Sequence, residues 1–170
     1  MPHPNTGAIR RNPIMAISIS LQEYLEWEGV DYELVHHPWI SGSMRTAEAA
    51  HIPGDKLAKC VVLEDEAGYL MAVLPATHEV DIDALSEQLG RDLQLASENE
   101  IRDMFDDCAT GAIPPMVKAF GYEAVIDESL EECDEIYFEA GDHTELVHLR
   151  GEDFTDLMAD LPHLHFSRHV

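Results

Sequence analysis

The sequence predicts an α+β fold, a single domain in which helices flank a mixed, mostly antiparallel sheet. Strand-like segments come in pairs joined by short turns, 59–63 with 69–74 and 136–138 with 146–149. Helix-like segments lie between these pairs and do not follow every strand, which argues against a doubly wound parallel sheet. A chain of 170 residues with 45% hydrophobic content suits one domain with a proper core.

The first third predicts two helices and a short strand. Ser20 and Glu23 match a capping box, and Gly29 closes the helix that they open. Alternation over 32–36 predicts a strand. Thr46 is expected to cap the next short helix.

The remaining chain continues the pattern. The strand at 59–63 and its partner are almost wholly apolar, so both faces are expected to be covered. Asp81 caps one helix, and Ser97 with Glu100 forms a capping box for the next. Asp127 ends a short strand and is expected to cap the segment after it.

Acidic residues dominate the composition, with a net charge of −24. The charge is −2 over residues 1–60, −10 over 61–120 and −12 over 121–170. Such a field repels polyanions, so DNA is not an expected partner, and any nucleic-acid contact should use the first third. No apolar run reaches 18 residues, so no membrane partner is expected. Three unpaired cysteines indicate a cytoplasmic protein.

The chain divides by composition into three parts. Residues 1–16 hold Arg10 and Arg11 without an apolar segment and are expected to be a disordered extension rather than a signal peptide. The folded domain is expected to span 17–162, and residues 163–170 form a C-terminal tail.

Lys59 and the Gly111 bend are the two features that invite a chemical interpretation. Lys59 is one of three lysines and stands at the mouth of the buried strand. Its stem can lie on apolar surface with the ammonium in water, or the ammonium can meet an anionic ligand. The run Gly-Ala-Ile-Pro-Pro at 111–115 can be neither regular helix nor central strand, and is either a tight structural turn or a site loop.

Other chemistries find little support in the sequence. Ten histidines are present, but none stands in a zinc-binding frame, so neither a metal nor another cofactor is expected. Cys60 is adjacent to Lys59 but should point to the opposite face of the strand, into the core. A GxSxG nucleophile elbow is missing from the sequence.

Several of these segments, taken in order, resemble the YbaK/ProX-type aminoacyl-tRNA deacylases, which also supply the editing insertion of bacterial prolyl-tRNA synthetases. The resemblance covers roughly residues 18–161, and its GxxxP motif has Gly111 and Pro115 as fixed ends. The matching pieces are His37-Pro38, Thr46-Ala47-Glu48-Ala49-Ala50, Ala58-Lys59-Cys60-Val61-Val62-Leu63, Ala72-Val73-Leu74-Pro75, Gly111-Ala112-Ile113-Pro114-Pro115, Val125-Ile126-Asp127 and Tyr137-Phe138-Glu139-Ala140-Gly141.

The resemblance implies a trans-editing hydrolase that cleaves the ester of misacylated tRNA with water, without a metal or a covalent enzyme nucleophile. Lys59 would be needed for activity, and main-chain N–H groups near Gly111 and Ala112 would stabilise the tetrahedral oxygen. The expected substrate contacts are Pro115, Thr46, Gly141 and His143. The expected partners are misacylated tRNA and an aminoacyl-tRNA synthetase.

Two alternatives remain open at this point. The same pocket would serve a hydrolase of another small ester or amide. A catalytically inactive module that docks to a synthetase or another protein would use the acidic surface instead.

Overall fold

The computed structural model describes residues 17–109 and 111–170, so the predicted extension with Arg10 and Arg11 lies outside the described residues. The strands are β1 (Glu33–His36), β2 (Leu57–Asp65), β3 (Gly68–Pro75), β4 (His78–Val80), β5 (Gln94–Leu95), β6 (Ala124–Asp127), β7 (Glu135–Glu139), β8 (Glu145–Arg150), β9 (His163–Leu164) and β10 (Ser167–His169). The helices are α2 (Ile19–Glu28), α3 (Ser43–Ala49), α4 (Ile82–Leu89), α5 (Glu98–Met104) and α6 (Gly151–Leu157), with 3-10 turns η1 (Gly54–Lys56), η2 (Val117–Ala119) and η3 (Glu128–Glu132).

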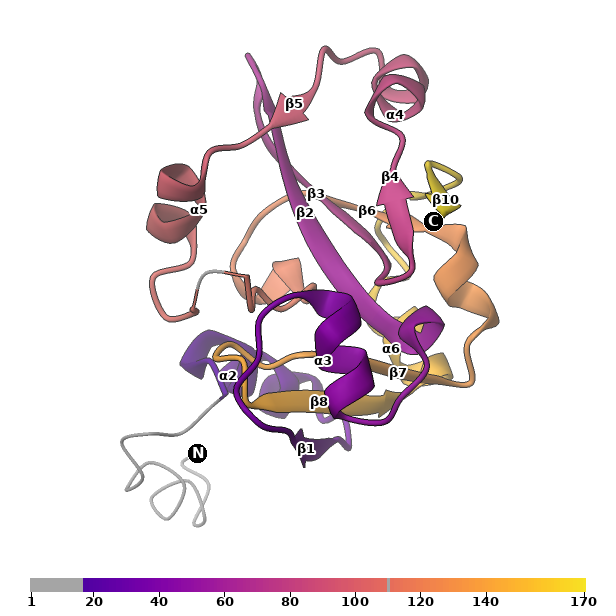
Figure 1. Cartoon of the computed structure of the whole chain (residues 1–170). Helices are drawn as coiled ribbons and strands as arrows, with labels where there is room; N and C mark the ends of the chain where they lie inside the picture. Colours follow the sequence, from indigo (N-terminus) through magenta and orange to yellow (C-terminus); the bar gives the residue numbers. More distant parts are fainter. Residues whose placement is uncertain (1–16, 110) are drawn as a thin grey trace.

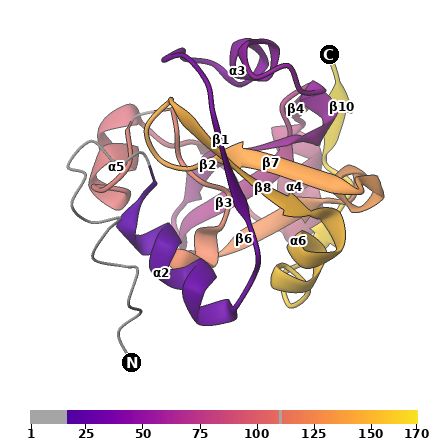
Figure 2. The ribbon, with the colours of Figure 1, turned by 90° about the horizontal axis from the view of Figure 1, so that it is seen from below.

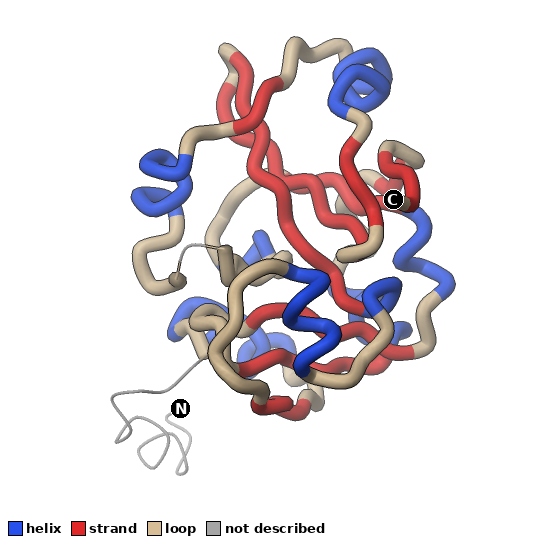
Figure 3. The backbone as a smooth tube through the Cα atoms, in the orientation of Figure 1, coloured by secondary structure: helices blue, strands red, loops and turns tan. Residues whose placement is uncertain are grey.

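A mixed sheet organises the molecule, with strand order β1-β8-β7-β2-β3-β6-β9 and β5 paired to β2 (Figures 1 and 3). The pairs β2–β7, β3–β6 and β6–β9 are parallel, whereas the other ladders are antiparallel. Both predicted hairpins, β2–β3 and β7–β8, are present. The α+β prediction is therefore confirmed. The last residues of the chain also join strands, β9 in this sheet and β10 in a two-stranded ladder with β4.

Helices cover both faces of the sheet, as the apolar composition of β2 and β3 predicts. Helices α2 and α6 pack on one face of β7 and β8, and α3 packs on the other (Figure 2). On β3, Leu74 packs toward Leu85 of α4, while Met71 packs with Phe105. Each of these four side chains is at most 1% exposed, and burial of one such side chain contributes about 1.5–3 kcal/mol.

Most helix caps follow the sequence, but two predictions were wrong. The first helix is capped by Ser18, whose hydroxyl accepts the Leu21 N–H. The Ser18 N–H also donates to Ala140 O, so a tertiary contact places the helix start before Ser20. Thr46 is not a cap, because α3 begins at Ser43 after Gly42, whose φ is 100°. The predicted caps at Asp81, Ser97 and Asp127 are confirmed.

One edge of β2 is incompletely paired. The edge of β2 that faces β3 is paired from Ala58 to Asp65. The opposite edge pairs with β7 only at Leu57 and Ala58, and with β5 only at Leu63 and Glu64. Within the described residues, the stretch 59–62 therefore has no strand beside it, and the sheet is open at this point.

Candidate functional site

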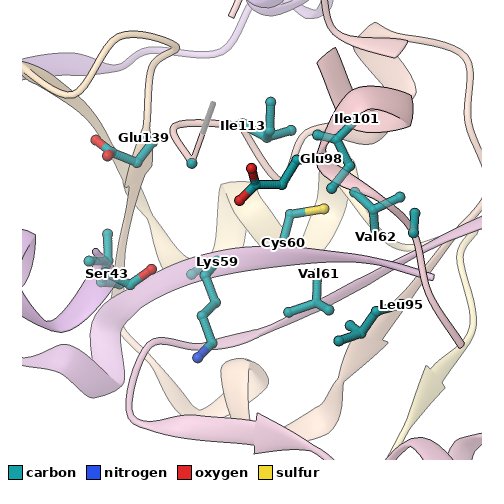
Figure 4. Close-up of a pocket in the computed structure, with 14 residues that line it drawn as sticks. Ser43, Lys59, Cys60, Val61, Val62, Leu95, Glu98, Ile101, Ile113 and Glu139 are labelled. Atoms are coloured by element: carbon teal, nitrogen blue, oxygen red, sulfur yellow. The ribbon is translucent and has the colours of Figure 1, made fainter. Parts of the chain in front are cut away.

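A cavity of about 300 Å³ lies at the open edge of β2. Its floor is residues 57–62 of β2, and its walls come from α3, β5, α5, the 111–113 bend and the end of β7 (Figure 4). The wall residues are Ser43, Leu95, Ala96, Glu98, Ile101, Gly111, Ile113 and Glu139. Segments far apart in the sequence thus converge on one small hollow.

The floor of the cavity presents backbone groups as well as side chains. The carbonyl of Val62 accepts the Ala96 N–H on the open edge. In a strand, alternate residues direct their backbone groups to the same edge, so the N–H and C=O of Cys60 also face the cavity. Neither group has a partner strand among the described residues. The Cys60 thiol packs toward the Phe105 cluster, and burial raises its pKa to about 12, so it is not a nucleophile.

Lys59 lines the same cavity as Gly111, but its ammonium points away from it. Figure 4 shows the Lys59 side chain on the opposite side of β2 from Cys60. The Lys59 ammonium donates to Ala76 O at 3.4 Å. Burial lowers the Lys59 pKa, while the charge of Glu79 acts in the other direction. Lys59 and the Gly111 bend, the two predicted catalytic features, therefore line one cavity, but the Lys59 ammonium does not lie at the bend.

The Gly111 bend is tightly constrained. Gly111 has φ of 85°, and a Cβ at this position would lie 3.3 Å from Cε1 of His143. Both observations favour glycine here. The N–H of Ala112 donates to Ala109 O at 3.0 Å, so this predicted oxyanion donor is already engaged in the turn. Pro115 is buried behind the bend and does not line the cavity.

A second loop, between β7 and β8, ties the site together. Ala140 O accepts the Ser18 N–H, Gly141 O accepts the Ala109 N–H, and Thr144 O accepts the His37 N–H, each at 2.7–2.8 Å. Gly141 has φ of 131° and is buried. The predicted residues Gly141 and His143 thus lie beside the Gly111 bend, although neither lines the cavity directly.

Trp39 covers His143 from outside. The two rings lie 5.3 Å apart between centroids, tilted by 59°. The Trp39 side chain is 68% exposed, whereas His143 is 4% exposed. The loop after β1 thus leaves a large aromatic surface open to solvent beside the bend.

No described contact joins Thr46 to the Gly111 bend or to the β7–β8 loop. It is fully buried inside α3, and its hydroxyl has no hydrogen-bond partner among the described residues. The residue that α3 contributes to the cavity is Ser43.

The structure adds two residues that the sequence did not single out, His37 and Glu139. Oε1 of Glu139 lies 3.5 Å from Nε2 of His37, and Oε2 lies 3.7 Å from Nδ1 of His143. Burial, followed by the charge of Asp142, raises the Glu139 pKa to about 8. Both residues fall within segments that carry the family resemblance, but nothing in the sequence indicates that these two segments meet.

Neither a cluster of metal-ligating side chains nor a membrane-spanning helix occurs in the described part of the chain. No group of three or more histidine, cysteine, aspartate or glutamate side chains is placed there to hold a metal ion. Within the same residues, no helix is long and apolar enough to cross a membrane.

Comparison with known families gives a match to the aminoacyl-tRNA editing domain over residues 37–157. This span includes the cavity, the Gly111 bend and the β7–β8 loop. The chain belongs to this family. The predicted resemblance is therefore confirmed at the level of the editing domain.

Solved structures share the fold of this editing domain at low identity. One is the hypothetical protein APE2540, with 18% identity, a TM-score of 0.78, and coverage of 88% of this chain and 99% of that chain. Another, described as a proposed trans-editing enzyme for prolyl-tRNA synthetase, has 20% identity, a TM-score of 0.76, and coverage of 88% and 95%. A protein of Marinobacter aquaeolei VT8, assigned to signal transduction, has 22% identity, a TM-score of 0.71, and coverage of 89% of this chain and 31% of that chain. No curated protein sequence matches the chain.

Proposed function

We propose that this editing domain is a trans-acting hydrolase that removes the amino acid from misacylated tRNA by attack of water on the aminoacyl ester. The observation that supports this proposal best is the cavity at the open edge of β2, with the Gly111 bend and Glu139 on its walls. Membership of the aminoacyl-tRNA editing family supports the same chemistry in general.

The size of the cavity suits a single amino acid. Small-molecule sites begin at about 300 Å³, and this cavity lies at that lower limit. Val62, Ile101 and Ile113 line the cavity with apolar side chains and would accept a small aliphatic side chain, although Glu98 of α5 also lines it. The polar groups lie toward the Gly111 bend and Glu139, where the ester would be cut. We therefore expect a small amino acid as the group removed.

The open edge of β2 offers contacts that every aminoacyl ester can use. The Cys60 carbonyl would accept a hydrogen bond from the α-ammonium group. The Cys60 N–H would donate to the ester carbonyl, whose oxygen becomes negative when water adds. Because the strand is fixed by its full ladder with β3, these donors and acceptors are already in place before the substrate binds.

Trp39 provides a surface for the end of the tRNA. Exposed aromatic rings hold unpaired nucleotides by stacking, at about 1–3 kcal/mol per base. Trp39 is exposed and packs on His143 beside the bend, so a terminal adenine stacked on it would direct its ribose ester into the cavity. All three cysteines are free thiols, which agrees with the reducing cytoplasm that we propose as the location.

A panel of mischarged tRNAs tests the proposal. The full-length protein should release the amino acid from at least one tRNA that carries a small, wrong amino acid. Ile113→Trp fills the apolar end of the cavity and should reduce the rate at least about tenfold, since the acyl group is displaced from the reacting position. Leu34→Trp, at an exposed site on β1 outside the cavity, is the matched control.

Two results separate the alternatives. If the wild-type protein hydrolyses small aryl esters but no tRNA ester, it is an esterase of another kind. If it hydrolyses neither and binds an aminoacyl-tRNA synthetase, it is a docking module without activity.

A further inference from the structure

We propose that Glu139 is the general base of this site and that His37 positions it by sharing a single proton with it. The inference rests on the proposed hydrolysis of an aminoacyl ester and names the groups that move the proton in that reaction. It stands on a contact between a strand end and a loop that are distant in the sequence.

The hydrogen bond on the far side of the His37 ring fixes its tautomer. Nδ1 of His37 lies 2.9 Å from Pro38 O. A carbonyl oxygen can only accept, so Nδ1 carries the hydrogen in the neutral ring, and Nε2 presents its lone pair. Nε2 lies 3.5 Å from Oε1 of Glu139. A proton on Glu139 therefore has an acceptor close by, and a small approach of the two side chains would let the pair hold one proton between them.

Burial isolates this pair from bulk water. His37 is 1% exposed and Glu139 is 8% exposed, and Glu139 reaches solvent through the cavity that it lines. Neither Nε2 of His37 nor Oε1 of Glu139 has a hydrogen-bond partner among the described residues. Buried polar atoms usually have such partners, so the two atoms are either satisfied by each other or by a molecule in the cavity.

The charged and titratable groups around Glu139 come from three elements. His37 faces it from the loop after β1, and His143 and Asp142 face it from the β7–β8 loop. Glu98 of α5 lines the same cavity. No lysine or arginine of the described residues pairs with Glu139. Glu139 is therefore buried without a lysine or arginine partner in the described part of the chain, which is costly and typical of a functional site.

The proposed proton transfers balance in two steps. As the water oxygen forms its bond to the ester carbonyl carbon, the water proton passes to the Glu139 carboxylate, and the carbonyl π electrons move onto the oxygen. When the tetrahedral intermediate collapses, the bond to the ribose oxygen breaks, and that oxygen takes the proton back from Glu139. The products are the free amino acid and an intact tRNA end, with Glu139 again ionised.

The surroundings of Glu139 also suit this role. A general base works best when its pKa is near the working pH, and burial places the Glu139 pKa near that point, at about 8. An ordinary exposed glutamate would be ionised but a weaker base.

Two variants with two matched controls test the proposal. Glu139→Gln keeps the shape of the side chain and removes the base. His37→Asn keeps an N–H near the position of Nδ1, for the bond to Pro38 O, but removes Nε2. Glu135→Gln, on the same strand and paired with His148 at the surface, controls for the first variant. His36→Asn, adjacent in the chain and exposed, controls for the second.

The measurement is kcat/KM against pH for the full-length protein, with the fastest mischarged tRNA of the panel and with the spontaneous rate subtracted. For the wild type and both controls, kcat/KM should rise with pH and level off above about pH 8. Glu139→Gln should lose about 100-fold or more and show no such rise. His37→Asn should move the midpoint by about half a pH unit or more, because the proton is no longer shared.

Each outcome has a clear meaning. A folded Glu139→Gln protein that keeps the wild-type pH profile overturns the proposal while leaving the proposed function intact. A His37→Asn protein that loses activity with an unmoved midpoint overturns the positioning role of His37. If His37→Asn does not fold, the pH profile of Glu139→Gln still decides the role of the base. If the wild type hydrolyses no tRNA of the panel, both proposals fall together.

Discussion

Glu139 is more buried than Glu98, the other acidic residue that lines the cavity. Its burial raises the pKa to about 8, against an ordinary value of 4.5. The folded protein keeps the Glu139 proton at pH values at which the unfolded chain releases it. The free energy of unfolding therefore falls as the pH rises through this range. The site thus reduces the stability of the fold at neutral and higher pH, as is common where function requires a buried ionisable group.

Glu139→Gln should therefore stabilise the protein in a pH-dependent way. Below about pH 4.5 both states of the wild type are protonated at this position, and the variant should gain little. Between about pH 4.5 and 8 the unfolded chain releases the proton and the folded chain keeps it, so the wild type loses stability and the variant does not. Above about pH 8 the gain should level off at around 5 kcal/mol.

Urea unfolding of both proteins at about pH 5, 7 and 9 measures this difference. Glu135→Gln, near the surface of the same strand, should show no comparable trend. An equal gain for Glu139→Gln at all three pH values would mean that the Glu139 pKa is not raised in the folded protein.

The proposed role of Lys59 rests on the sequence more than on the structure. Its ammonium lies across β2 from the bend, bonded to Ala76 O, while its backbone forms part of the cavity floor. From that side it can hold a phosphate of the tRNA end more readily than it can reach the ester. Lys59→Met keeps most of the apolar stem and should raise KM for aminoacyl-tRNA at least about fivefold with a smaller change in kcat. A loss in kcat alone would instead place the ammonium at the ester.

At the scale of elements, the proposed function depends on the stretch of β2 that has no neighbouring strand on one edge. The strand is fully paired to β3, but β7 and β5 each cover only two residues of its other edge. The gap leaves the Cys60 backbone facing a hollow that is closed by α5 and the Gly111 bend. Edge strands are usually covered or paired, so an open stretch inside a sheet is suited to a ligand.

The elements also show which parts of the fold can be read from the sequence. The β2–β3 and β7–β8 hairpins are local, so apolar runs separated by turns that contain glycine predict them. The parallel pairs β2–β7 and β3–β6 join distant segments, and no local pattern specifies them. The meeting of His37 with Glu139 depends on the pairing of β1 with β8, which also joins distant segments, so the resemblance named His143 and Gly141 as substrate contacts but not His37 and Glu139.

For the whole molecule, the proposed function requires a chain with a net charge of −24 to bind tRNA, a polyanion. Half of the lysines and arginines in the described part of the chain are held in ion pairs: Lys56 with Asp134, Lys118 with Asp160, Arg91 with Asp65, and Arg150 with Asp153. Arg45 is exposed on α3, the helix that contributes Ser43 to the cavity, and no ion pair holds it among the described residues. Long-range repulsion would therefore oppose the proposed binding of tRNA, and few local contacts would offset it.

Two consequences follow for tRNA binding. Added salt should lower KM for tRNA between about 0.1 M and 1 M, the reverse of ordinary nucleic-acid binding, because it screens net repulsion. Arg45→Ala should raise KM several-fold, whereas Lys56→Ala should have a smaller effect, since Lys56 is occupied by Asp134. Steady-state deacylation at several salt concentrations gives both results. A KM that rises steeply with salt would mean that cations other than Arg45 and Lys56 dominate tRNA binding.

Hydrolysis in heavy-oxygen water, with the fastest mischarged tRNA of the panel, tests most directly whether water cuts the aminoacyl ester in this cavity. The wild type should place the heavy oxygen in the carboxylate of the released amino acid and leave a tRNA that can be charged again, while Ile113→Trp should do so at least about tenfold more slowly. Release of an amino acid without the heavy oxygen, or equal rates for the wild type and Ile113→Trp, would contradict the account.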